Sequence, residues 1–315
     1  MRLFLFWISF VLKGIIRFFF TKSMKNYSFI MCAIFVCTFL SSCHSTHSDE
    51  ITDEESVVCN FTDFQIVQGS LDESLTRGTT AEQKYSLLAV DVLNGTYIQS
   101  VSRIQQPESE VLADLSMSLS VGKHDIYFIC GTNQWHSFDE KSLLVSWNET
   151  TAILGDVWSS HVEVTVTPGV VQNKSVDLQR AVAMVVTCMT DTVPASVNTL
   201  QQVLMGGSWT YNLSKMSGDI PATISKTISF PTTMIGTSNV KSGIYTFIPA
   251  GYTMANNYTI TALDASSNTI VSHSFSSVPL TLNRYTMYKG KFFVTDTSFG
   301  LDLKTEWGAD NVITF

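Results

Sequence analysis

Short runs of β-branched and aromatic residues, separated by turn residues, recur along this chain and constrain its fold more than any other feature. Residues 115–121 alternate apolar and polar side chains at period two, as a half-buried strand does. Residues 162–167 alternate in the same way and end at a Pro-Gly pair. Asn94-Gly95 follows the apolar run 85–93, which predicts a hairpin turn. Runs of about 5–10 residues with turns between them are typical of antiparallel β-sandwiches.

The longest apolar run, residues 176–189, is ambiguous by length alone, since a helix could also span it. Its centre is rich in β-branched residues, so we favour strand. Residues 132–161 are less regular, and 206–221 form a polar, Gly/Ser-rich loop. Further strands are expected at 57–67, 200–204, 224–230, 244–248, 258–263, 269–275, 286–294 and 301–305.

The domain division follows from length and from one turn-rich segment. Residues 168–175 contain Pro, Gly, Asn and Ser, and a new series of strands starts after them. The chain beyond residue 42 is long enough for two domains of about 100–200 residues each. We therefore predict an all-β protein with two β-sandwich domains, 57–172 and 173–315.

The first 42 residues predict a targeting segment. They hold five basic residues and no acidic one, and the apolar run 29–40 is too short to span a membrane. Leu40-Ser41-Ser42-Cys43 resembles the bacterial lipobox, so we predict cleavage before Cys43 and acylation of its thiol. An ordinary signal peptide with a chance cysteine is the alternative. Residues 1–23 could be a start-site extension, because Met24 begins a complete signal; the start, Met1 or Met24, stays open.

Residues 43–56 are polar and acidic and predict a flexible tether between lipid and domain. The whole chain carries 27 acidic and 19 basic side chains, and five of the basic ones lie in the targeting segment. This balance argues against a nucleic-acid partner, which needs clustered Lys and Arg.

Three cysteines remain after Cys43, namely Cys59, Cys130 and Cys188. Their odd number allows at most one disulfide, and none has zinc-ligand spacing. Each lies in an apolar run, which favours small buried hydrophobes over reactive thiols.

Motifs of catalysis are not found: the sequence has no GxSxG, HExxH or P-loop. The histidines His124, His136, His161 and His273 are scattered, and His124 follows a Gly-Lys turn, so we expect it to be exposed. We predict no enzyme activity, no cofactor and no metal site. Trp135, Trp147 and Trp158 could form a sugar-stacking platform, but core packing is the favoured interpretation.

Several motifs resemble, in order, the fimbrillins of the FimA/FimB-type superfamily, the lipoprotein precursors of type V pili. After the lipobox, Leu75-Thr76-Arg77-Gly78 precedes the strand-like run 87–95, as at the family's processing site. Gly155-Asp156-Val157-Trp158 then precedes a Leu178-x-Arg180-x-Val182-Ala183 pattern, which is similar to the family's second-domain entry. Asp191-Thr192-Val193-Pro194 follows.

The resemblance implies two transthyretin-like β-sandwiches on a surface-exposed lipoprotein of the outer membrane, or of the fimbrium. In polymerising members a protease cuts after an arginine, the first strand leaves, and a neighbouring subunit donates a strand. Arg77 is the matching candidate site, although anchor members stay uncut and an ordinary loop arginine is the alternative. The implied partners are other fimbrial subunits, membrane lipid through Cys43, and a host or bacterial surface ligand that the sequence does not identify.

The same mechanism makes a prediction about residues 57–67. A sandwich that lacks one strand exposes unpaired backbone groups and apolar pockets, which a donated strand can fill. We expect residues 57–67 to be this removable strand, in a groove that it could leave and not paired between two other strands. Residues 311–315, with the strands before them, are the candidate donor. A surface glycan-binding lipoprotein is the alternative function.

Overall fold

The structure is a computed structural model, and it describes residues 56–66, 85–105, 114–148, 150–151, 153–294 and 299–303. In these segments the regular elements are strands, apart from the short 3-10 helix η1 (Thr232–Met234). The predicted all-β class is therefore confirmed. None of the helices in the described segments is long and apolar enough to cross a membrane. Cys43, Arg77, the tether up to residue 55 and the candidate donor 311–315 lie outside the described residues.

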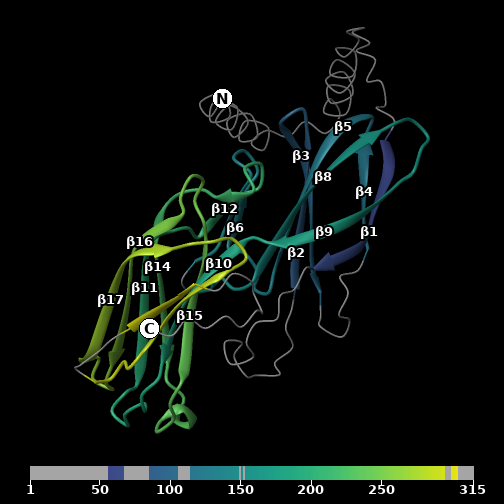
Figure 1. Ribbon diagram of the computed structural model, residues 1–315. Helices are drawn as coiled ribbons and strands as arrows, with labels where there is room; N and C mark the ends of the chain where they lie inside the picture. Colours follow the sequence, from purple (N-terminus) through teal and green to yellow (C-terminus); the bar gives the residue numbers. More distant parts are fainter. Residues whose placement is uncertain are drawn as a thin grey trace, which may run out of the picture. The chain divides into compact units, whose positions relative to one another are not determined.

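The first seven-stranded sheet has the order β3-β2-β5-β8-β9-β1-β4 and folds over at the β8–β9 corner (Figure 1). Only two residue pairs, Trp158–Arg180 and Ser159–Gln179, join β8 to β9. One half, β3-β2-β5-β8, faces the other half, β9-β1-β4, across one apolar core. Six of the seven strands contribute fully buried side chains to this core. The strands are β1 (Ser56–Ile66), β2 (Tyr85–Leu93), β3 (Thr96–Gln105), β4 (Leu115–Ser120), β5 (Gly122–Gly131), β8 (Val157–Val166) and β9 (Gln172–Arg180).

Two four-stranded sheets, β15-β10-β18-β19 and β14-β11-β16-β17, form a second sandwich around a separate core. Tyr258, Leu200 and Val185 are among the side chains that fill it. The strands are β10 (Val182–Met189), β11 (Thr199–Gly207), β14 (Ala222–Ser229), β15 (Val240–Phe247), β16 (Met254–Leu263), β17 (Thr269–Pro279), β18 (Tyr285–Gly290) and β19 (Phe299–Leu303).

A small sheet, β13-β12-β7-β6, pairs segments that lie far apart in sequence. β7 pairs with β12 in antiparallel register, and the Trp147 amide donates to the Trp209 carbonyl oxygen at 3.0 Å. These strands fall in the regions expected to be irregular, 132–161 and 206–221. They are short, with β6 at Ser137–Asp139, β7 at Leu144–Ser146, β12 at Thr210–Asn212 and β13 at Ser217–Gly218.

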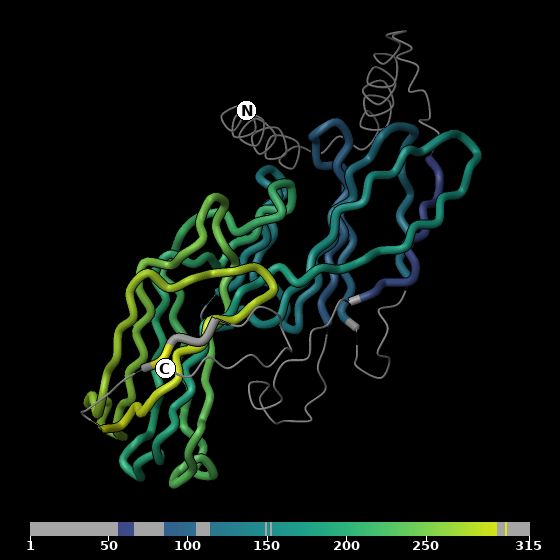
Figure 2. Tube along the Cα trace, viewed as in Figure 1, coloured from purple at the N-terminus to yellow at the C-terminus, as the bar shows by residue number. Residues whose placement is uncertain are grey.

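The expected junction at 172/173 falls at the start of β9. Because β9 pairs with β8 and β1, residues 173–180 belong to the first sheet. The chain changes sheets at Ala181, between β9 and β10. Figure 2 shows the continuous trace that runs from the one sheet into the other. The run 176–189 is thus strand, as predicted, but it consists of two strands in different sheets.

Local patterns predicted the other elements well. The hairpin between β2 and β3 turns at Asn94 and Gly95, whose φ angles of 52° and 79° are positive, as a type I′ turn requires. In β4, Leu115, Met117 and Leu119 are buried and the serines between them point outward. Alternation therefore assigns the faces of individual strands correctly.

Candidate functional site

Strand β1 is the sequence-predicted functional element that the structure describes, and it lies between two other strands. It pairs with β9 in parallel and with β4 in antiparallel register (Figure 1). Cys59 lies opposite Gln172 on one side and Met117 on the other. Our prediction that residues 57–67 lie in a groove that they could leave, not paired between two other strands, is therefore wrong for the uncut chain, in which β1 is paired on both sides. Its departure would have to break two ladders, so β1 is more firmly held than a sheet-edge strand.

The inner face of β1 is apolar and buried. Val57, Cys59 and Phe61 are 7%, 0% and 0% exposed, whereas Val58 between them is 48% exposed. β1 therefore buries one face only, and each large apolar side chain contributes about 1.5–3 kcal/mol to holding it.

A β-bulge at Asp63 changes the phase of this alternation. Asp63 has a φ of 51°, and the register against β9 shifts between Thr62 and Gln65. The shift turns Phe64 inward, so that Phe61 and Phe64 both meet the ring of Phe128, with centroids 5.0 and 5.6 Å away. The bulge thus places two aromatic anchors on one ring of β5.

On the outer face, Asn60 connects β1 to both neighbours. Its amide nitrogen donates to Oδ1 of Asn173 on β9 at 3.0 Å. Its own Oδ1 accepts from Ser116 Oγ on β4 at 2.8 Å. Because these bonds are exposed to water, each adds only about 0.5–1.5 kcal/mol.

β1 is also what joins β4 to the rest of its layer. Within the described sheet, β4 pairs with β1 alone, and β9 has a second partner, β8, over two residue pairs only. Without β1, the chain would present a slot between β4 and β9, lined by the pockets of Val57, Cys59, Phe61 and Phe64.

The motifs that carried the family resemblance meet at the β8–β9 corner. The Arg180 guanidinium donates to Asp156 at 2.6 and 3.3 Å, donates to Asn283 at 3.2 Å, and lies over the Trp158 ring at 5.4 Å. Burial raises the pKa of Asp156, and Arg180 lowers it in part. This buried ion pair fixes the corner where the first sheet folds over.

The cysteines and tryptophans are structural. Cys59, Cys130 and Cys188 are buried, as predicted, and all three are free thiols. Burial raises the pKa of Cys130 to about 12. Trp158 is buried in the first core, whereas Trp147 belongs to a different cluster, against which Trp135 also packs. The core interpretation is confirmed, and the three rings do not form one sugar-stacking platform.

His124 corrects the sequence analysis, because it is fully buried rather than exposed. Its Nδ1 lies 2.7 Å from Asp91 Oδ1, and its Nε2 lies 2.8 Å from the Ser120 carbonyl oxygen. The Gly-Lys pair begins strand β5 rather than forming a turn, and the Lys123 side chain is exposed while the following side chain, His124, points inward. Alternation from Ile126 backward was the signal that could have shown this.

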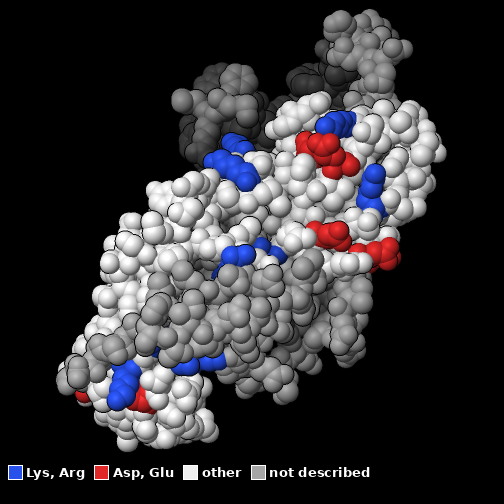
Figure 3. Space-filling model, in the orientation of Figure 1, with Lys and Arg blue, Asp and Glu red and all other residues white. Residues whose placement is uncertain are grey.

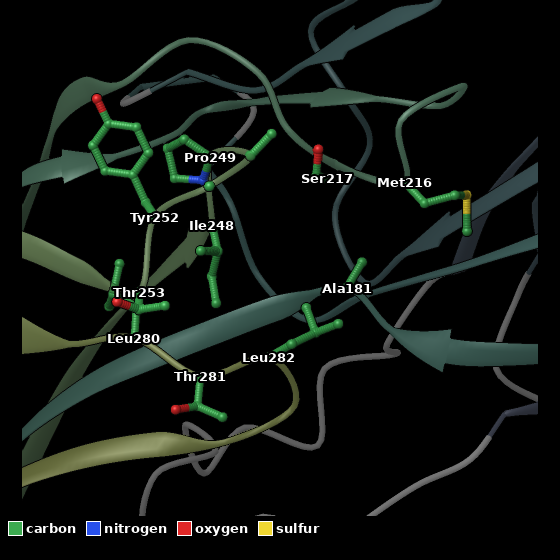
Figure 4. A pocket seen from close by; sticks show the side chains of 12 residues that line it. Ala181, Met216, Ser217, Ile248, Pro249, Tyr252, Thr253, Leu280, Thr281 and Leu282 are labelled. Carbon is green, nitrogen blue, oxygen red and sulfur yellow. The ribbon is translucent and has the colours of Figure 1, made fainter.

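A cavity of about 440 Å³ lies beside the start of β10. In Figure 4, Pro249 and Tyr252 lie at one end and Met216 at the other, with Ala181 and Leu282 between. None of its lining residues is charged.

Within the described segments, no group of three or more His, Cys, Asp or Glu side chains could hold a metal ion. Figure 3 shows charged side chains of both signs in small, separate groups.

No family model matches the sequence, and no curated protein matches it. Several solved structures show similarity, among them the following three. A candidate adhesin from Bacteroides ovatus has 9% identity and a TM-score of 0.47, over 72% of this chain and 85% of that chain. A candidate polysaccharide-binding protein from Bacteroides thetaiotaomicron has 10% identity and a TM-score of 0.43, over 80% of this chain and 100% of that chain. A fimbrial assembly protein from Parabacteroides distasonis has 12% identity and a TM-score of 0.41, over 79% of this chain and 96% of that chain. Because these values are low, we base the functional proposal on the chain's own residues.

Proposed function

We propose that this chain is a fimbrial structural subunit or anchor lipoprotein of the FimA/FimB type, which acts in cell-surface adhesion and assembles by strand exchange. Lipid on Cys43 attaches it to the outer membrane, and the residues between Cys43 and the start of β1 at Ser56 are the tether. We do not extend the proposal to glycan binding, because Trp147 and Trp158 lie in separate cores.

The observation that carries the proposal is the place of β1. It is the first described strand of the chain, buries one face only, and alone joins β4 to β9. A donated strand of similar pattern would restore two ladders and refill the pockets of Phe61 and Phe64. Because β1 is paired on both sides, exchange before cleavage is slow, and a cut after Arg77 is what allows β1 to be replaced.

Arginine-specific proteolysis tests the assembly step. The purified chain is treated with an arginine-specific protease, and its mass and oligomeric state are followed. We expect a cut after Arg77 followed by concentration-dependent polymers, and Arg77→Gln should remain uncut and monomeric. Cutting without any polymer would remove the stalk and tip roles and leave the anchor. Polymers of equal size from uncut Arg77→Gln would contradict the proposal.

Replacement of Cys43 tests the anchor. Cys43→Ala should carry no lipid and should leave the membrane fraction, as mass spectrometry and detergent partitioning would show. A lipid found on the Cys43→Ala chain would contradict the anchoring step.

A further inference from the structure

Within its own sequence and its register with β1, strand β4 carries none of the features that usually protect a sheet edge. Its sequence alternates Leu, Met and Ser, with no charge and no proline, and its register with β1 has no bulge. Such a regular edge is a template for pairing with another chain. In a chain proposed to exchange strands, an open second edge on β4 would compete with the slot.

Side chains from the opposite layer occupy this edge instead. Gln99 Nε2 on β3 donates to the Ser118 carbonyl oxygen at 2.6 Å, and Arg103 Nη1 donates to that of Asp114 at 2.7 Å. His124 Nε2 on β5 donates to the carbonyl oxygen of Ser120 at 2.8 Å. Residues 114, 118 and 120 are an even number apart, so in an extended strand their carbonyl groups point to the same edge.

A buried carboxylate holds two of these donors in place. Asp91 on β2 is fully buried; its Oδ1 lies 2.7 Å from His124 Nδ1, and its Oδ2 accepts from Gln99 Nε2 at 3.3 Å. Because the partner of His124 Nε2 is a carbonyl oxygen, Nε2 must carry a proton. The ring is thus fixed between β2 and β4.

We propose that Asp91, Gln99, Arg103 and His124, here called the β4 edge network, close the outer edge of β4 and so direct an incoming strand to the slot between β4 and β9. This inference rests on the proposed strand exchange. It assigns to these four residues the choice of where a second copy can pair, while β1 and its slot supply the binding.

The test uses the whole chain, purified in detergent and not treated with protease, so that β1 still fills its slot. Gln99→Ala/Arg103→Ala removes two donors at partly exposed positions and leaves the buried Asp91–His124 pair intact. We expect its self-association constant, from sedimentation velocity, to exceed that of the wild type at least about tenfold. Hydrogen exchange should show new protection of residues 115–120 in the associated form.

Gln201→Ala/Lys291→Ala is the matched control, since it removes one glutamine and one cation at exposed positions in the second sandwich, away from β4. It should remain like the wild type. The inference is overturned if the network variant stays as monomeric as this control, or if it associates without protection of residues 115–120. Association of the uncut variant, together with a wild type that forms no polymers after cleavage, would leave the edge inference standing and would remove the stalk and tip roles from the proposed function.

Discussion

Among the described strands, each sandwich contains one parallel pair, β1–β9 in the first and β10–β18 in the second, and the two pairs differ in how they are buried. Every residue of β10 is buried: Val185 faces the core of the second sandwich, while Met184 and Val186 belong to a separate apolar cluster. In β1 only one face is buried, and Val58 and Asn60 face outward.

The two strands also differ in their place in the chain. β10 continues from β9 and leads on to β11, so it cannot leave without breaking the fold (Figure 2). β1 is the first described strand, and the next one, β2, begins only at Tyr85. A strand that comes first among the described strands and is buried on one face can be replaced by an equivalent strand, whereas an internal strand buried on both faces cannot.

The largest expected effects test whether β1 is held by one face. Phe61→Ala should lower the free energy of unfolding by about 3–5 kcal/mol, since the ring is fully buried against Phe128. Val58→Ala should change it by less than about 0.5 kcal/mol. Urea unfolding of both variants measures the difference. Equal losses of unfolding free energy at the two positions would show that the outer face of β1 also helps to hold the strand in the sheet.

The corner that folds the first sheet is expected to be nearly as sensitive. Arg180→Ala leaves the Asp156 carboxylate buried without its cation, which should cost about 3–5 kcal/mol at neutral pH. Loss of the guanidinium raises the pKa of Asp156 further, so the folded chain binds a proton more tightly than the unfolded chain. The deficit relative to the wild type is therefore present above the raised pKa and shrinks as the pH falls through it.

Urea unfolding at pH 7 and at mildly acidic pH measures this trend. Asp156→Asn in the Arg180→Ala background is the control, because it removes the charge and should make the deficit independent of pH. A deficit in Arg180→Ala that grows on acidification would contradict the buried ion pair.

In the second sandwich a buried hydroxyl pair joins the two sheets. Tyr258 on β16 and Thr187 on β10 approach to 3.0 Å between hydroxyl oxygens. Tyr258→Phe leaves the Thr187 hydroxyl without this partner and should cost about 1–3 kcal/mol. The Tyr97 hydroxyl bonds to the exposed Glu140, so Tyr97→Phe should cost less. Thermal unfolding of both variants measures the difference. The reverse order would mean that burial does not set the value of these bonds.

The smallest expected effect concerns the outer face of β1. Asn60→Ala should cost about 1 kcal/mol, because water competes for its bonds to Asn173 and Ser116. A double-mutant cycle with Ser116→Ala measures the coupling. A coupling well above that of an exposed hydrogen bond would show that the polar face of β1, too, anchors the strand.

Period-two alternation and turn residues were enough to predict most strands and the all-β class, because these signals are local. Leu115–Ser120 and the Asn94-Gly95 turn are examples in which the side chains themselves specify face and direction. The apolar runs around the three cysteines also predicted that these side chains are buried. Short strands such as β7 and β12 escaped prediction because two or three residues carry no periodicity.

The pairing of strands was decided only by the tertiary structure. The run 176–189 has one composition throughout, yet it changes sheets at Ala181. The preceding residue, Arg180, donates a hydrogen bond to Asp156 at this corner. In the same way, the sequence indicated that residues 57–67 form a strand but not that β4 and β9 enclose it. Alternation says which side chains share a face, whereas the neighbours of a strand depend on contacts between residues far apart in sequence, which form only when two layers close on a common core.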